Sequence, residues 1–474
     1  MTVLDTEILV IGSGAGGATT AAVLGEAGRS VLLVEEGPWV DPDEVEPFSL
    51  PEMERKYRHH GCSAALGSPP IAYAEGCCVG GSTEINSGLW HRLPGHLAEE
   101  WRAGGAIDGF DDATLDRYAS LVEGWQSVGY TPVAPPESSA LLERGATKLG
   151  WQSVEFPRVF RYGEGTRAVK QTMARTLIPR AQAAGATVMP DTRVLRLARR
   201  GDRVVSVEAR RSRPEGGPDE RLTIRADQVV VCGGAIQSPA LLQRSGFRGP
   251  VGRGLKLHPT VKIAARFPEA IDHGDVPMHR IVEFAPNLTI GGSASRRGHV
   301  ALAVADCDAE AAARLDDWEH VGVYYAAIRS DAGGRVLAVP GLRDPVVTYR
   351  LTDGDLSRLA RGLLHLGEAL LAAGATELYP SVIGAPVVTD VAGLAGWWST
   401  VDRRRSQLMT VHLTSSVRMG TDPAIAGTDS YGVVHGIRNL RVNDASLLPD
   451  APGVNPQATI MTIAARNADA LLAS

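Results

Sequence analysis

The feature that most constrains the fold is a glycine-rich turn near the N-terminus, in the stretch EILVIGSGAGGATTAAVLGEAGRSVLLVEEG that begins at Glu7. Residues 8–11 form a short apolar run typical of a buried parallel strand, and residues 18–27 favour a helix that Gly28 closes. A second apolar run follows at residues 31–34. Strand, turn, helix and strand in this order predict a parallel βαβ unit and an α/β fold.

The three glycines of the turn, Gly12, Gly14 and Gly17, have the spacing of a dinucleotide-binding site. In such a site the first glycine permits the tight turn, the second lets a pyrophosphate approach the backbone, and the third lets helix and strand pack closely. Glu35 ends the second apolar run, where a carboxylate can accept hydrogen bonds from ribose hydroxyls. This acid favours NAD or FAD over NADP, and the turn alone does not separate the first two.

Composition and charge exclude several classes of protein. The chain has 474 residues, and its net charge of −6 argues against a general affinity for nucleic acid. No stretch approaches the run of about eighteen apolar residues that a membrane helix needs, and Asp5 and Glu7 stand where an export signal would be basic. The five cysteines lack the paired spacing of a metal site. We therefore expect no metal, free thiols and a soluble cytoplasmic protein.

Five further segments follow the glycine turn along the chain. They read GCCVGGSTEIN, CGGAIQSPALLQRSG, GRGLKLHP, HLTSSVRMG and DASLLPDAPGVNPQATI. Together with GSGAGG they resemble, in order, the segments of the glucose–methanol–choline (GMC) family of flavin oxidoreductases. The resemblance runs from the first predicted strand to the last predicted helix. It implies a Rossmann-like FAD-binding domain built from separated segments and a substrate domain with a large, mainly antiparallel sheet, which makes the fold α/β locally and α+β overall.

The resemblance and the strand pattern also predict domain boundaries. We expect residues 1–100, 165–257 and 430–474 to form the FAD-binding domain, and residues 101–164 and 258–429 to form the substrate-binding domain. In the second of these, RIVEFAPNLTI, HVALAVADC and WEHVGVYYAAIRS have the alternation of strands, whereas DLSRLARGLLHLGEALLAAG has helical spacing. These stretches are the expected substrate sheet and its covering helix.

The resemblance further implies which residues hold FAD. The expected set is Gly12, Gly14, Ala15, Gly17, Glu35, Gly80, Gly81, Ser82, Asn86, Val194, Asp444, Ala445, Pro456 and Thr459. Of these, Val194 would contact adenine through its backbone, and Asp444 would help to close the flavin end. Some family members link FAD covalently to a histidine that follows the GGS loop. Residues 82–88 contain no histidine, so we expect noncovalent FAD.

His412 is the predicted catalytic base. A lone histidine is usually structural, but HLTSSVRMG resembles the family segment whose histidine lies over the flavin and acts on the alcohol. Ser415 and Ser416 stand where the family commonly has glycine and threonine, whereas the spacing from His412 to Met419 is kept. A neutral imidazole can take the hydroxyl proton while flavin N5 accepts a hydride. Asn455, at the family's partner position, would orient the substrate oxygen; stacking or hydrogen bonding to the flavin is its alternative role.

Two other histidines, His258 in LKLHPT and His91, are interpreted as structural or close to the cofactor, and neither is predicted to be catalytic. The substrate domain contains few Phe residues and several acids that are candidates for facing a polar ligand, with surface placement as the alternative. These acids are Glu283, Asp306, Asp308 and Glu310.

The sequence thus predicts an FAD-dependent alcohol oxidase or dehydrogenase whose electrons pass to oxygen or another acceptor. We expect a polar substrate such as a sugar or amino sugar, and as a narrower hypothesis a primary hydroxyl of an aminoglycoside in antibiotic biosynthesis. The alternatives are a redox-silent, hydroxynitrile-lyase-like enzyme, an oxidase of an aliphatic alcohol or sterol, and a flavin-binding protein without activity. The sequence leaves the oligomeric state open.

Overall fold

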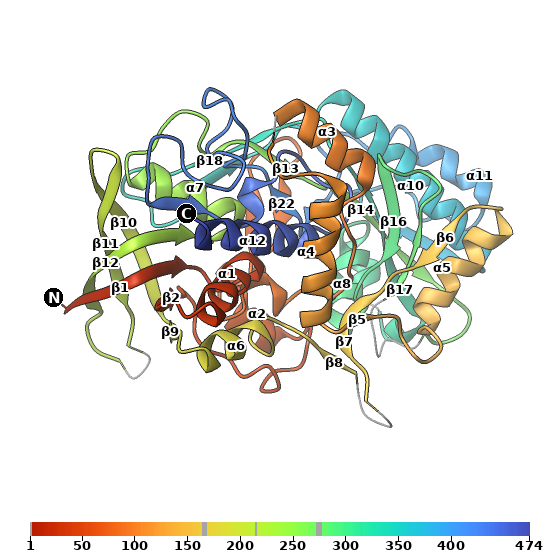
Figure 1. The fold of residues 1–474 in the computed structure, drawn as a ribbon. Coiled ribbons are helices and arrows are strands. Elements are labelled where there is room, and N and C mark those ends of the chain that lie inside the picture. Colours follow the sequence, from red (N-terminus) through yellow and green to blue (C-terminus); the bar gives the residue numbers. More distant parts are fainter. Residues whose placement is uncertain (1, 106, 164–167, 214–215, 272–276, 314) are drawn as a thin grey trace.

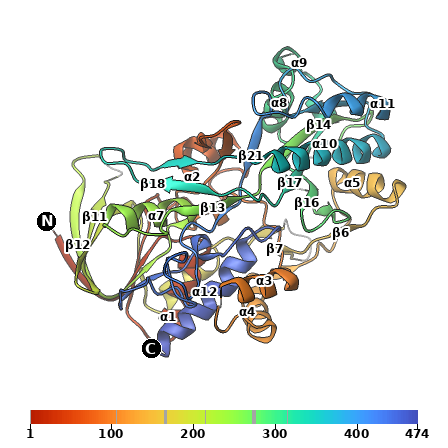
Figure 2. The same ribbon diagram turned by 90° about the horizontal axis from the view of Figure 1, so that it is seen from above.

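Two large sheets lie at opposite ends of the molecule (Figures 1 and 2). The computed structural model describes residues 2–105, 107–163, 168–213, 216–271, 277–313 and 315–474. Helices and loops from distant parts of the sequence fill the space between the sheets. Both predicted layers, a Rossmann-like layer and a mainly antiparallel sheet, are therefore present.

The first sheet contains the predicted βαβ unit. Its strand order is β10 (Thr192–Arg200), β11 (Arg203–Arg211), β12 (Glu220–Val231), β1 (Thr2–Ile11), β2 (Val31–Val34) and β9 (Thr187–Met189), with β23 (Leu440–Val442) also pairing with β12. β1 pairs in parallel with both β12 and β2, and the helix between β1 and β2 is α1 (Ala15–Glu26). The long C-terminal helix α12 (Gln457–Leu472) packs against α1. Segments from both ends of the chain therefore build this layer.

The second sheet is larger and mainly antiparallel. Its order is β3 (Ser63–Ala65), β4 (Ile71–Tyr73), β21 (Leu408–Thr410), β14 (Thr260–Arg266), β17 (Val321–Ile328), β16 (Leu288–Gly292), β15 (His279–Ile281) and β6 (Ser153–Glu155), with β20 (Glu377–Pro380) pairing with β14. The predicted helix is α10 (Asp353–Ala373), which covers one face. Thr352 and Asp355 form a capping box at its start, and Gly374, with a φ of +109°, ends it in the left-handed conformation.

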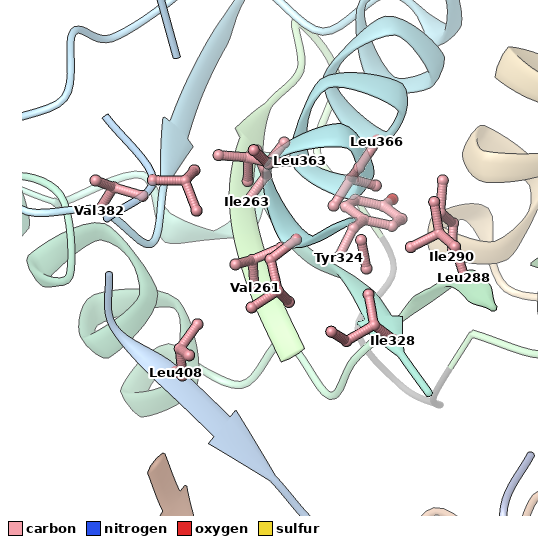
Figure 3. Close-up of a cluster of buried hydrophobic side chains, with 14 of the residues drawn as sticks. Val261, Ile263, Leu288, Ile290, Tyr324, Ile328, Leu363, Leu366, Val382 and Leu408 are labelled. Carbon is pink, nitrogen blue, oxygen red and sulfur yellow. The ribbon is translucent and has the colours of Figure 1, made fainter. Parts of the chain in front are cut away.

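The core of this layer lies between α10 and the sheet (Figure 3). Ile263, Ile290 and Tyr324 extend from the sheet towards Leu363 and Leu366 of the helix, and all five are fully buried. Because side chains alternate along a strand, the neighbours of these residues point to the opposite face of the sheet. That opposite face is where the candidate site lies.

One predicted strand is wrong. The stretch HVALAVADC lies mainly in a helix, α8 (Arg297–Ala305). Val300, Ala303 and Val304 follow a spacing of three and four residues, so a helix places them together, and they pack on β14 and β17. A short apolar run fits either a strand or a helix, and here the tertiary contacts decided between them.

The domain boundaries stay a prediction. β3 and β4, within residues 1–100, hydrogen bond in the larger sheet. A small sheet joins the two predicted domains; its order is β19 (Val346–Thr348), β18 (Gly334–Leu337), β13 (Arg253–Leu257) and β22 (Leu413–Thr414). The boundary between residues 164 and 165 lies outside the described residues.

The remaining elements surround these sheets. They are α2 (Leu50–Lys56), α3 (Gly95–Gly105), α4 (Asp112–Trp125), β5 (Val128–Gly129), α5 (Glu137–Lys148), β7 (Arg158–Arg161), β8 (Val169–Lys170), α6 (Leu177–Ala183), α7 (Gly234–Arg244), α9 (Ala309–Ala313) and α11 (Val391–Leu394). In the part of the chain that the structure describes, no helix is both long and apolar enough to cross a membrane.

Candidate active site

The glycine turn connects the end of β1 to the start of α1, and two of its glycines are required by close backbone packing. A Cβ atom at Gly12, whose φ is +102°, would lie 2.4 Å from the carbonyl oxygen of Cys232. At Gly17 it would lie 1.8 Å from the carbonyl oxygen of Gly12. Larger side chains at these positions would separate α1 from the sheet.

Gly14 is different, because its α-carbon faces the second glycine-rich loop. Its nearest neighbour on that side is the α-carbon of Gly81, 3.9 Å from a Cβ atom built on Gly14. Gly14 is also the N-cap of α1, which has no side-chain cap and no acidic residue in its first turn. The unpaired N–H groups and the positive end of the helix dipole therefore suit a pyrophosphate at this point.

Glu35 is held in place by Ser13, a residue of the turn that the sequence analysis did not single out. One carboxylate oxygen of Glu35 accepts hydrogen bonds from the backbone N–H (2.9 Å) and hydroxyl (2.6 Å) of Ser13, and the other accepts from Gly37 N–H (3.0 Å). The Ser13 hydroxyl oxygen also accepts from Gly80 N–H at 3.0 Å. Burial raises the pKa of Glu35. Ser13 thus links the acid to both glycine loops, and its polar side chain between Gly12 and Gly14 was the available signal.

The second loop also contacts the start of α12. The Asn86 amide donates to the side-chain oxygen of Gln457 at 2.6 Å, and Ser82 Oγ accepts from Gly76 N–H at 3.0 Å. Pro456 is the N-cap of α12, and the buried hydroxyl of Thr459 has no hydrogen-bond partner among the described residues. A polar ligand between the second loop and α12 would satisfy this hydroxyl.

The other predicted cofactor residues lie around the same layer. Asp444 is buried, and its two oxygens accept from Gly234 N–H, the Ser238 hydroxyl, and the N–H and hydroxyl of Ser446. With four donors bound, Asp444 fixes the turn after β23, and Ala445 follows it. Val194 is a buried residue of β10.

These observations fit FAD. A helix N-terminus without a cap, an oriented carboxylate and an unsatisfied hydroxyl are the polar groups that its pyrophosphate, ribose and flavin would use. Among the described residues, no group of three or more His, Cys, Asp or Glu side chains could hold a metal ion.

The two predicted catalytic residues, His412 and Asn455, line one pocket. His412 lies between β21 and β22, and Asn455 lies two residues before α12. The remaining lining residues come mainly from the open face of the larger sheet. They are His258, Arg280, Thr289, Tyr325, Ala327, Ile328, Gly453 and Val454. The fold therefore brings the end of the nucleotide-binding layer against the substrate sheet.

His258 contacts His412 directly. The Nδ1 atoms of the two rings are 2.9 Å apart, and Gly453 N–H donates to Nε2 of His258 at 3.1 Å. Because a backbone N–H only donates, Nε2 of neutral His258 carries no proton, so Nδ1 carries it and donates to Nδ1 of His412. Neutral His412 then carries its proton at Nε2. The motif LKLHPT contains His258, but the sequence did not predict this contact, because the two histidines are 154 positions apart.

Both rings are neutral at ordinary pH. Burial, followed by the charge of Arg280, lowers the pKa of His412 to about 3. The pKa of His258 lies well below its usual value, because of burial and then of His412 and Arg280. An unprotonated imidazole is the form that a general base requires.

His91 lies close to this pair. Its ring centroid is 3.9 Å from that of Phe156, and neither ring nitrogen has a hydrogen-bond partner among the described residues. Its pKa is well below the usual value, first through burial and then through Arg280 and His412. His91 therefore contributes a neutral ring beside the pocket.

The acidic residues proposed to face a polar ligand do not line the pocket. Glu283 is exposed and accepts from Gln152 N–H, and Asp306 pairs with Lys262 at 3.1 Å. Asp308 accepts from two backbone N–H groups at the start of α9, and Glu310 is exposed. The alternative interpretation, that these acids lie outside the substrate site, therefore fits the structure, and the arginine that lines the pocket is Arg280. An arginine inside the apolar stretch around RIVEF was the signal that the sequence analysis missed.

Comparison with known proteins supports this assignment. Family models described as GMC oxidoreductase match residues 6–260 and 334–464. An uncharacterized GMC-type oxidoreductase of Sinorhizobium fredii is 36% identical over 99% of this chain and 95% of its own length. A long-chain-alcohol oxidase of Arabidopsis thaliana is 27% identical over 97% of this chain and 66% of its own. A paromamine 6'-oxidase of Streptomyces fradiae is also 27% identical, over 98% and 91%.

The fold is shared with a solved structure. Pyridoxine 4-oxidase, whose source is given as Mesorbium loti, superimposes with a TM-score of 0.73 at 20% identity and covers 99% of both chains. Together with the family models, this likeness confirms the predicted fold. The chain therefore belongs to the GMC oxidoreductase family and is an FAD-dependent enzyme that oxidises alcohol (CH–OH) groups.

Proposed function

We propose that this enzyme oxidises a polar alcohol in the pocket between His412 and Asn455, with His412 as the base. The observation that supports it is the presence of both side chains in one pocket, although 43 positions of sequence separate them. When bound, FAD supplies the hydride acceptor. The residues of the chain have to bind the alcohol, orient it and take its proton.

In this mechanism, the substrate hydroxyl replaces His258 as the partner of His412. The lone pair of neutral His412 is at Nδ1, where His258 now donates. A hydroxyl that donates to this lone pair is aligned for proton transfer to it. The Asn455 amide lines the same pocket, so its N–H can hold the hydroxyl oxygen. In the reverse direction, protonated His412 returns the proton.

We further propose that FAD is bound noncovalently by the two glycine loops, Glu35 and the start of α12. The support is the glycine loop at residues 80–88, which offers no histidine for a covalent link. Acid precipitation of the yellow protein should release all the flavin into the supernatant. Flavin that stays with the precipitate would contradict noncovalent binding.

The polar side chains on one wall of the pocket favour a polar substrate. Thr289, Tyr325 and Arg280 place hydroxyl and guanidinium groups on the sheet side, whereas a long-chain alcohol or sterol would require an extended apolar cavity. The relative acting on paromamine keeps an amino sugar as a second candidate. Its ammonium groups would lie beside Arg280 without an acid to pair with, so we rank a sugar or another uncharged or anionic alcohol first.

The test is anaerobic reduction of the enzyme-bound flavin by neutral sugars, aminoglycosides, aliphatic alcohols and a sterol. One polar class should bleach the flavin, and His412→Ala should slow bleaching by about a hundredfold to ten-thousandfold. Asn455→Ala should slow it less, and His60→Ala, at an exposed histidine, should leave it unchanged. Adding oxygen then tells an oxidase, which forms hydrogen peroxide, from a dehydrogenase.

Two outcomes would contradict the proposal. Bleaching that survives in His412→Ala would remove the base assignment. Cyanohydrin cleavage by a protein whose flavin no alcohol bleaches would favour the lyase alternative.

A further inference from the structure

Arg280 occupies an unusual position on the open face of the substrate sheet. It is the central residue of β15 and is only 4% exposed. Its strand partner is Gly291 of β16, and Gly291 in turn pairs with Tyr325 of β17. Directly paired residues share a face of an antiparallel sheet, so Arg280 and Tyr325 flank a glycine on the pocket side.

The glycine lets Tyr325 lean across it. A Cβ atom at Gly291 would lie 2.6 Å from the Tyr325 hydroxyl oxygen. The hydroxyl is therefore above the Gly291 backbone, on the side of Arg280, and Tyr325 partly offsets the lowering of the pKa of Arg280 by burial. The row Arg280–Gly291–Tyr325 places a guanidinium and a phenol hydroxyl next to each other at the pocket wall.

Among the described residues, no Asp or Glu forms an ion pair with Arg280. Its Nε and Nη1 atoms are buried and form no hydrogen bond with any described residue. None of the described residues that line the pocket is an Asp or Glu. The guanidinium also lies over the Phe156 ring, whose centroid is 5.1 Å from the guanidinium carbon. A buried cation with free donors is costly, which points to a ligand that supplies the missing charge.

We propose that Arg280, assisted by Tyr325, binds an oxyanion of the substrate, a carboxylate or a phosphate, so that the enzyme oxidises an anionic alcohol. This inference rests on the proposed function, because it places the oxyanion and the reacting CH–OH group on one molecule. The planar guanidinium offers two parallel donors to such a group. Arg280, His412 and Asn455 line the same pocket, as this arrangement requires.

A bound oxyanion would also strengthen the base. Arg280 is one of the two causes that lower the pKa of His412. Neutralising Arg280 raises that pKa, so His412 accepts a proton more readily when the anionic substrate is in place. A neutral alcohol would leave the charge of Arg280 unpaired and the pKa of His412 low.

The first experiment measures binding without turnover, on the purified holoenzyme. Acetate, benzoate, phenyl phosphate and inorganic phosphate are titrated while the flavin spectrum and the heat of binding are recorded, with benzamide as the neutral match for benzoate. We expect at least one anion to bind, benzamide not to bind, and Arg280→Gln to weaken anion binding by about ten- to a hundredfold. Carboxylates and phosphates are titrated separately, so the class of anion that binds more tightly identifies the oxyanion.

Two further variants show whether the loss is specific. Arg280→Lys keeps the charge and should recover part of the affinity, although without the paired donors. Arg266→Gln alters an arginine of the same sheet that pairs with Asp317 and Glu377, and should bind anions as the wild type does. Flavin content and melting temperature confirm that each variant is folded and loaded.

The second experiment compares 4-(hydroxymethyl)benzoate with its methyl ester in anaerobic flavin reduction. The acid should reduce the flavin faster than the ester, and Arg280→Gln should remove this preference. Anion binding that is absent, or equal in wild type and Arg280→Gln, would overturn the inference. If only neutral alcohols then reduce the flavin, in a manner that depends on His412, the inference fails while the proposed function stands. If anions bind through Arg280 but His412→Ala turns over normally, the proposed function fails instead.

Discussion

Two buried arginines, Arg58 and Arg280, are in opposite electrostatic situations. Arg58 lies 2.9 Å from Glu36 and 3.8 Å from both Glu75 and Asp344. Although burial opposes it, Glu36 and Glu75 hold the pKa of Arg58 above its usual value, and Arg58 helps to lower the pKa of Glu36 to about 2. Arg280 pairs with no acid among the described residues, and burial lowers its pKa.

The difference separates a structural site from a binding site. The Arg58 cluster pairs its cation with acids of the fold, although Arg58 Nε has no hydrogen-bond partner among the described residues, and it ties the segment after β2 to the loop near Asp344. The pocket around Arg280 leaves donors free next to the predicted base. Buried charge that the fold does not neutralise stabilises nothing by itself, so its presence indicates a ligand.

The largest expected effect is on the paired site. Arg58→Met leaves the buried carboxylates without their cation and should lower the free energy of unfolding by about 3–5 kcal/mol. Urea unfolding of the holoenzyme measures this. Arg438→Met, which breaks an exposed pair with Asp202, is the control and should cost about 1 kcal/mol or less. Equal losses in both variants would show that the Arg58 cluster is not structurally important.

At Arg280, the same kind of substitution should change the free energy of unfolding in the opposite direction. Arg280→Met removes a buried charge that has no partner, so the free energy of unfolding should rise by about 1 kcal/mol or more, while anion binding is lost. The same urea titration and the flavin spectrum measure the two effects. A variant that is destabilised and also loses FAD would show that Arg280 supports the cofactor instead of a substrate.

The pH dependence of kcat/KM should show whether the unpaired charge of Arg280 lowers the pKa of His412. His412 faces Arg280, His258 and His91, and its pKa is lowered to about 3. The base therefore stays unprotonated well below the usual histidine value of about 6.5, and activity should not fall near that pH. In Arg280→Met one cause of the lowering is gone, so the pKa of His412 rises and the acid limb moves to higher pH. An unmoved limb would contradict this coupling.

The smallest effects should come from the acids outside the pocket. Glu283→Ala should change the free energy of unfolding by no more than about 0.5 kcal/mol, Asp308→Ala should lower it by about 1 kcal/mol because it removes the cap of α9, and neither should change KM. Steady-state kinetics with the substrate found above would measure KM. A several-fold rise in KM for Glu283→Ala would return this acid to the substrate site.

The larger sheet shows where sequence reasoning reached its limit. Alternation and helical spacing predicted β17 and α10, but the apolar run HVALAVADC fits either period, and only its packing on β14 and β17 makes it the helix α8. The acids of this region were candidates because of their residue type. Their exposure depends on which face of each element the core buries, and that is a property of the whole fold.

The sequence by itself determined the nucleotide-binding unit and the family. Both depend on local requirements of the chain. In the first turn, for example, Cys232 leaves no room for a side chain at Gly12, and Gly12 leaves none at Gly17. The spacing of such glycines can be recognised in the sequence. Only the tertiary structure brought His258 to His412 across 154 positions and left Arg280 unpaired beside them. Hydrogen bonds and charge compensation depend on distances in space, and for residues this far apart in the chain those distances are set by the packing of two sheets.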